Sequence, residues 1–132
     1  MGIAEVRSPA LSHPLGAFSQ AMKVSGQGSY VFVSGLTSRA PDGSVVGIGD
    51  ITLQTETILK NLGAILREAG GSLDNVVRVG VFIRDMNHFP EIHEVRRRYF
   101  KEPYPASTMV EVSRMVSPEH LIEIEATAFI SG

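Results

Sequence analysis

Two segments carry apolar residues at the spacing of an amphipathic helix. In residues 51–69 the apolar positions recur every three or four residues, Asp50 precedes them as a good N-cap, and two glycines follow them. A second segment of this kind covers residues 87–100, where Pro90 is tolerated because it lies in the first turn. The pattern therefore predicts two helices.

Other segments alternate apolar and polar residues or form short runs of β-branched residues, as strands do. Four of them are predicted to be strands, at residues 30–35, 75–84, 107–115 and 121–130. Residues 18–24 alternate loosely, and residues 1–15 show so little periodicity that we expect an irregular N-terminal arm. The order of these elements predicts a single α+β domain over residues 1–132.

The last predicted strand has two different faces. One is wholly apolar, whereas the other mixes apolar residues with two glutamates, Glu123 and Glu125. Two helices can cover only one face of a sheet of this size, so we expect the apolar face to lie beneath them. The mixed face suits neither a core nor solvent. We therefore expect several sheets to associate in a homo-oligomer, with pockets between the subunits.

The composition excludes several kinds of chemistry. The 132 residues include no cysteine, which rules out a disulfide scaffold, a thiolate nucleophile and any cysteine-based metal site. The net charge of −2 does not favour nucleic acid or an anionic membrane as the main partner. No signal peptide is evident, and no apolar run approaches the ~20 residues that span a bilayer. We expect a soluble, cytoplasmic protein.

Residue spacing alone gives few candidates for catalysis. Glu123 and Glu125 share one side of a strand, where a carboxylate could transfer protons at a subunit interface, but an ordinary exposed pair is the commoner case. His88 and His93 are five residues apart, which is not the spacing of a helical metal pair, so no metal site is expected. The run Arg96-Arg97-Arg98 is predicted to be a solvated helix face.

Six short segments carry more information when they are taken together. They are Gly16-Ala17-Phe18-Ser19-Gln20-Ala21, Val31-Phe32-Val33-Ser34-Gly35, Gln54-Thr55 with Asn61, Val81-Phe82-Ile83-Arg84-Asp85-Met86, Pro105-Ala106-Ser107-Thr108 and Ile122-Glu123-Ile124-Glu125-Ala126-Thr127-Ala128. In this order, from about residue 16 to residue 130, they resemble the RidA (YjgF-like) family.

The resemblance implies a fold and an activity. The fold is chorismate-mutase-like, of the bacillar type, with a mixed sheet of about six strands and two helices on one face. It implies a homotrimer with a central barrel and active sites between subunits. The implied activity is hydrolysis of reactive enamines and imines to ketones and ammonia, a form of metabolite detoxification, without metal or organic cofactor. Glu123 matches the family's glutamate, which orients water and passes protons.

Three positions depart from the family pattern. Ser107 stands where the deaminases of amino-acid-derived enamines have an arginine that clamps the substrate carboxylate, and a hydroxyl supplies neither that charge nor that fork of donors. Phe18 lacks the phenolic hydroxyl of the family's tyrosine, and His93 replaces a residue that is often asparagine. We therefore expect a substrate other than 2-aminoacrylate.

One branch of the family offers an alternative anion site. Residues 34–42 and 121–123 are similar to the 2-aminomuconate deaminases of aromatic catabolism, although that branch also commonly keeps the missing arginine. On this interpretation Arg39 or Arg114 binds the substrate anion, and His93 or His120 assists. The residues expected to line the cleft are Phe18, Ser34, Gly35, His93, Ser107 and Met109.

Two other functions stay open. The loss of the clamp arginine is also compatible with a non-catalytic member of the family that binds a small metabolite or acts like a chaperone. The ribonuclease or translation-inhibitor activity of some relatives is a weaker alternative, because the net charge of −2 does not favour RNA.

Overall fold

The computed structural model of the chain describes residues 2–132. Within them six strands and two α-helices follow one another as β1 (Ile3–Val6), β2 (Ala21–Val24), β3 (Gly28–Leu36), α1 (Ile51–Glu68), β4 (Val76–Ile83), α2 (Phe89–Tyr99), β5 (Ala106–Glu111) and β6 (Ile122–Ser131). Neither helix of this part of the chain is long and apolar enough to cross a membrane.

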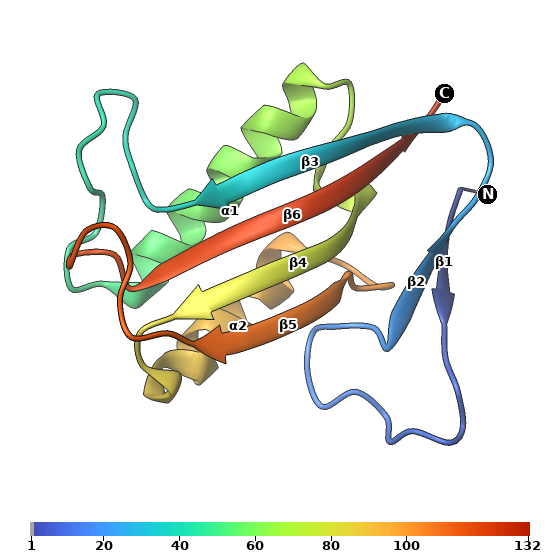
Figure 1. Ribbon diagram of the computed structural model, residues 1–132, viewed down its shortest axis with the longest axis horizontal. Coiled ribbons are helices and arrows are strands. Elements are labelled where there is room, and N and C mark those ends of the chain that lie inside the picture. The colour runs from blue at the N-terminus through green and yellow to red at the C-terminus, as the bar shows by residue number, and fades with distance from the viewer. Residues whose placement is uncertain (1) are drawn as a thin grey trace.

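The main sheet has the strand order β3-β6-β4-β5. β6 is antiparallel to both of its neighbours, and β5 runs parallel to β4. Both helices lie on one face of the sheet and leave the other face open (Figure 1). The predicted α+β class, a mixed sheet with two helices on one face, is confirmed. The six strands are divided between this four-stranded sheet and a separate ribbon of β1 and β2.

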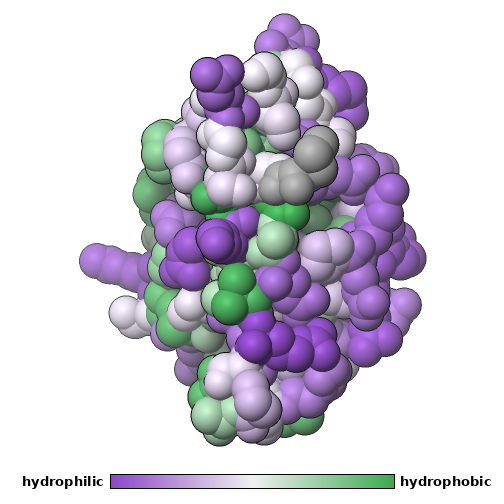
Figure 2. All heavy atoms as spheres, turned by 90° about the vertical axis from the view of Figure 1, so that its right-hand side faces the viewer, coloured by the Kyte–Doolittle hydropathy of each residue, from purple (hydrophilic) through white to green (hydrophobic). Residues whose placement is uncertain are grey.

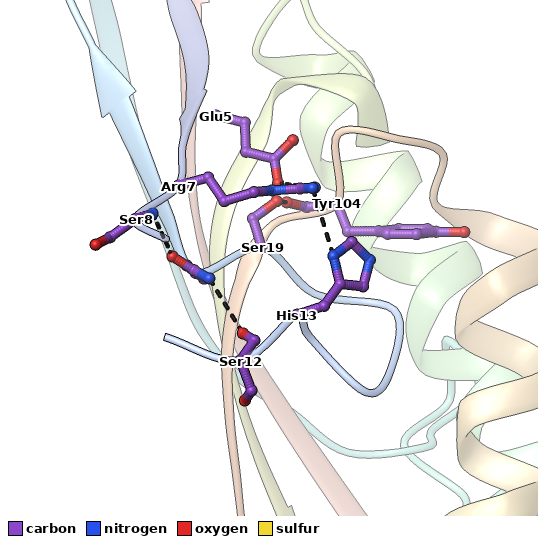
Figure 3. A network of polar contacts seen from close by, with 8 residues as sticks. Glu5, Arg7, Ser8, Ser12, His13, Ser19 and Tyr104 are labelled. Carbon is purple, nitrogen blue, oxygen red and sulfur yellow. Dashed lines mark hydrogen bonds and ion pairs between the residues drawn. The ribbon is translucent and has the colours of Figure 1, made fainter. Parts of the chain in front are cut away.

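The N-terminal arm is more ordered than predicted. Residues 3–6 form β1, which pairs antiparallel with β2, so the prediction of an irregular arm is wrong for this part. Four residues are too few for their alternation to be recognised in the sequence. The loop that follows is held by polar contacts, in which Arg7 donates to a Glu5 carboxylate oxygen 2.9 Å away and also contacts the His13 ring (Figure 3).

The other elements begin and end close to the predicted residues. Asp50 caps α1 by accepting a hydrogen bond from the Leu53 backbone N–H, 3.0 Å away. β5 ends at Glu111 rather than at Met115 as predicted. The reason is that its partner β4 ends at Ile83, directly opposite Glu111.

The core lies between the helices and the sheet. Its fully buried side chains come from α1, α2, β4 and β6, and include Ile58, Leu62, Ile83, Ile92 and Ile122. Each large apolar side chain buried in this way contributes roughly 1.5–3 kcal/mol. A shift of β6 by one residue would turn its apolar side chains away from the helices, so this burial fixes the register that also places Glu123.

The open face of the sheet carries exposed apolar side chains. Phe32 is 77 % exposed, Tyr30 53 % and Val110 40 %. In Figure 2 this face lies on the left, where hydrophobic side chains gather along the edge, whereas the helix side on the right is mostly hydrophilic. The open face thus has the mixed character that was predicted from β6, and the single chain leaves it uncovered.

Candidate functional site

Glu123 lies near the start of β6, and its side chain is on the open face, opposite Phe82 of β4. On the other side of β6, the pairing with β3 is irregular between Val33 and Leu36, where Gly35 lies. A Cβ atom at residue 35 would overlap the Glu123 carboxylate. Glycine at this position therefore provides the space that the carboxylate occupies.

Gln54, which is fully buried on α1, fixes the chain that leads into β6. Its amide nitrogen donates to the carbonyl oxygens of Gly47 and Glu119, at 3.0 and 2.8 Å. Its amide oxygen accepts from the Leu121 backbone N–H at 2.9 Å. Two of these hydrogen bonds hold the segment immediately before Glu123 against α1, and the third holds Gly47 in the loop that precedes α1.

Arg39 and His120 form a pair at the same end of the sheet. Arg39 donates to the Gly43 carbonyl oxygen at 2.7 Å and to Nε2 of His120 at 2.9 Å. A guanidinium only donates, so His120 carries its proton on Nδ1, an atom that is buried and unpartnered within residues 2–132. Burial, together with the nearby Arg39 charge, lowers the pKa of His120. We call Gly35, Arg39, His120 and Glu123 the β6-end cluster.

A second group of predicted residues lies at the opposite edge of the sheet. Arg96 of α2 is only 4 % exposed, and its Nη2 donates to the Ser107 hydroxyl oxygen at 2.8 Å and to the Ala17 carbonyl oxygen at 3.5 Å. The prediction of a solvated face is therefore wrong for Arg96, although Arg97 and Arg98 are exposed. The burial of Arg96 could have been inferred from its helical spacing, because Arg96 shares the buried side of α2 with Ile92 and Val95.

His93 and Phe18 lie around Gly16, the residue before Ala17, whose carbonyl oxygen accepts from Arg96. A Cβ atom at Gly16 would come 3.0 Å from the His93 ring and 3.5 Å from the Phe18 ring, so both rings border Gly16. Nε2 of His93 accepts from Arg97 at 3.0 Å. Burial, Arg97 and Arg96 all lower the pKa of His93, which favours a neutral imidazole. We call Phe18, His93, Arg96 and Ser107 the β5-edge cluster.

The two clusters do not meet within one chain. Glu123 is opposite Phe82, which is opposite Val110, so these three side chains share the open face. Ser107 is opposite Val79, a core residue, and therefore points to the helix side. The two strands that carry Glu123 and Ser107 are separated by β4, which places them about 10 Å apart across the sheet.

The other predicted site residues belong to neither cluster. Ser34 is exposed beside Gly35 on β3. Met109 is half-buried and packs against the core. Arg114 is exposed in the loop between β5 and β6, where it lines a cavity of about 650 Å³ together with Arg84. Within residues 2–132, no three His, Asp or Glu side chains are grouped in a way that could hold a metal ion.

Comparison with known proteins identifies the family. The sequence model described as Endoribonuclease L-PSP matches residues 9–130. A RutC family protein of Pyrococcus abyssi is 44 % identical over 116 residues, which are 88 % of this chain and 88 % of that protein. The chain belongs to the RidA/YjgF/RutC family. Its membership confirms the resemblance in the sequence, but not the 2-aminomuconate deaminase branch.

Other members of the RidA family are named for deaminase activities. The 3-aminoacrylate deaminase RutC of Acinetobacter baylyi is 37 % identical over 117 residues, 89 % of this chain and 90 % of that protein. The 2-iminobutanoate/2-iminopropanoate deaminase of Dermatophagoides farinae is 30 % identical over 125 residues, 95 % of this chain and 94 % of that protein.

Solved structures of the RidA family share the fold. A Rid family protein of unknown function from Yersinia pestis has a TM-score of 0.88 at 27 % identity, and covers 98 % of this chain and 100 % of its own. RidA from an Antarctic Psychrobacter has a TM-score of 0.73 at 29 % identity, and covers 96 % of this chain and 99 % of its own.

Proposed function

We propose that this RidA-family chain is a hydrolytic deaminase of reactive enamines and imines that needs no metal or organic cofactor. Relatives named as 3-aminoacrylate and 2-imino acid deaminases support this class of activity. The observation that carries the proposal is the Glu123 carboxylate, which lies on the open face against Gly35. Within residues 2–132 it has no ion-pair partner, so it is free to accept and donate protons.

The reaction needs only proton transfers and one water molecule. The enamine gains a proton at carbon and becomes an iminium ion. Water then adds to the iminium carbon and loses a proton, which gives a neutral carbinolamine. The carbinolamine nitrogen gains a proton and leaves as ammonia while the hydroxyl group loses its proton, so that enamine and water become ketone and ammonia. A single carboxylate that orients the water and exchanges protons with it, the role proposed for Glu123, serves these steps.

We propose that the active unit is a homotrimer with a central barrel. Because the β6-end and β5-edge clusters are apart in one chain, the site would be completed when the β6-end cluster of one chain faces the β5-edge cluster of a neighbour. The exposed Phe32 and Tyr30 on the open face supply apolar surface for such an interface.

The proposed substrate differs from 2-aminoacrylate. Because Ser107 is smaller than the family's arginine, the proposed substrate is a longer molecule, such as 2-aminomuconate. A cytoplasmic location and a role in aromatic catabolism stay predictions.

The test is substitution of Glu123 by glutamine, which keeps the shape of the side chain but removes its proton-transfer capacity. Glu123→Gln is expected to lower ammonia release roughly 100-fold or more while the trimer stays intact. Glu125→Gln is the matched control, because Glu125 lies on the same strand and the same face. Equal activity of Glu123→Gln and wild type would refute the assigned role.

A further inference from the structure

Arg96 carries a buried charge that no side chain of residues 2–132 neutralises. It is 4 % exposed, and no carboxylate of the described chain lies within ion-pair distance of its guanidinium. Burial lowers its pKa to about 10, so it remains a cation at neutral pH. A buried cation without a partner destabilises a fold, unless an anion approaches it in the working protein.

The hydrogen bonds of Arg96 leave donors for such an anion. Both bonds use Nη2, so Nε and Nη1 have no acceptor in the described chain. Within residues 2–132, side-chain nitrogens that are both shielded from solvent and without a hydrogen-bond partner occur in Arg84, His88 and His120, but not in Arg96. The free donors of Arg96 therefore keep contact with solvent.

Ser107 extends this donor group towards the edge of the sheet. Its oxygen accepts from Arg96, so its own proton is free to point outwards. Ser107 is half-buried on β5, which is an edge strand, and the rings of Phe18 and His93 lie nearby on the same side. Neither ring brings a negative charge to this edge.

The other two candidate arginines are placed differently. Arg39 already uses both terminal nitrogens, for Gly43 and His120. Arg114 is exposed to solvent, where an ion pair is worth little. Of the three, Arg96 is the arginine that combines burial, unused donors and a neighbouring hydroxyl.

We propose that Arg96 and Ser107 together bind the carboxylate of the substrate. The guanidinium supplies the charge and the Ser107 hydroxyl supplies a further donor, so the preferred substrate is an enamine or imine that carries a carboxylate group. This inference rests on the proposed deaminase function. It assigns anion binding to α2 rather than to the loops that hold Arg39 and Arg114.

The test measures binding of a stable product analogue to the full-length protein. 2-Oxohexanoate is titrated calorimetrically into wild type, Arg96→Met and Ser107→Ala, with 2-oxohexanamide as the uncharged probe. Arg96→Met is expected to weaken binding of the acid roughly 10- to 100-fold, and Ser107→Ala by less, with the amide unaffected. Arg98→Met is the control, because it removes the same charge from an exposed position on the same helix.

Two results would overturn the proposal. One is an Arg96→Met protein that binds the acid as tightly as wild type does. The other is a wild-type protein that binds the acid no better than the amide. If Arg96→Met does not fold, a crystal structure of wild type with 2-oxohexanoate decides instead. A carboxylate on Arg96 and Ser107 supports the proposal, and a carboxylate on Arg39 or Arg114 refutes it.

The same proteins separate this inference from the proposed function. If Arg96→Met no longer binds the acid and the wild-type protein releases no ammonia from any enamine, the deaminase function is refuted and the anion site is supported. Ammonia release that depends on Glu123 but is unchanged in Arg96→Met would keep the deaminase and refute the anion site.

Discussion

The contact between Gly35 and Glu123 predicts that adding one methyl group will remove activity without unfolding the protein. In Gly35→Ala the new Cβ would overlap the Glu123 carboxylate, and would lie 2.9 Å from its Cδ and 3.2 Å from its Cγ. Ordinary carbon contacts need about 3.5–4.0 Å, so the carboxylate must move by about 1 Å. A displacement of that size costs roughly 100-fold in rate at a catalytic group.

The stability of Gly35→Ala is expected to change little. Gly35 is exposed and does not have a positive φ, so alanine fits its backbone conformation. Glu123 is on the open face and can rotate away, at a cost of about 1 kcal/mol. Thermal unfolding and light scattering would check that the fold and the assembly persist while ammonia release is measured.

Gly80→Ala is the matched control for this prediction. A Cβ at Gly80 would come 2.8 Å from a carboxylate oxygen of Glu125, on the same face of the sheet. If position 35 acts through Glu123, Gly35→Ala combined with Glu123→Gln should be no slower than Glu123→Gln alone. Full activity in Gly35→Ala, or an equal loss in Gly80→Ala, would refute the reasoning.

Two further predictions concern stability and assembly. The pKa of His120 is lowered in the fold, so the stability that neutral His120 contributes is complete above pH 6.5 and is lost as the pH falls through the folded pKa. His120→Gln should therefore flatten a plot of Tm against pH below pH 6.5. An unchanged slope in this variant would contradict the role given to His120. Phe32→Glu places a charge on the exposed apolar face and should dissociate the proposed trimer in sedimentation experiments; a trimer that persists would show that this face is not the interface.

Much of the fold could be predicted from the sequence, because its signals are periodic. The apolar spacing of α1 and α2 and the alternation of β6 reflect burial, so they locate the core and the open face. β1 was missed because four residues give too short a pattern. The end of β5 was misplaced because it depends on where β4 ends, which is a property of the pairing rather than of the residues themselves.

Less of the candidate site could be predicted from the sequence. The positions of Glu123 and Gly35 followed from a family resemblance, but their mutual contact depends on an irregularity in β3 that the sequence does not reveal. The basic run Arg96-Arg97-Arg98 predicts a solvated helix face because all three residues are charged, although the spacing of Arg96 from Ile92 places Arg96 on the buried side of α2. The prediction followed from the charge of Arg96, whereas its burial follows from its position on the helix.

The proposed deaminase function is tested most directly by ammonia release from freshly generated 2-aminomuconate and 2-aminoacrylate, measured with wild type, Glu123→Gln and Glu125→Gln. We predict turnover of 2-aminomuconate in preference to 2-aminoacrylate. We also predict a loss of roughly 100-fold or more in Glu123→Gln and none in Glu125→Gln, with all three proteins trimeric. Undiminished turnover in Glu123→Gln, or no ammonia release from either enamine by wild type, would contradict the proposed function.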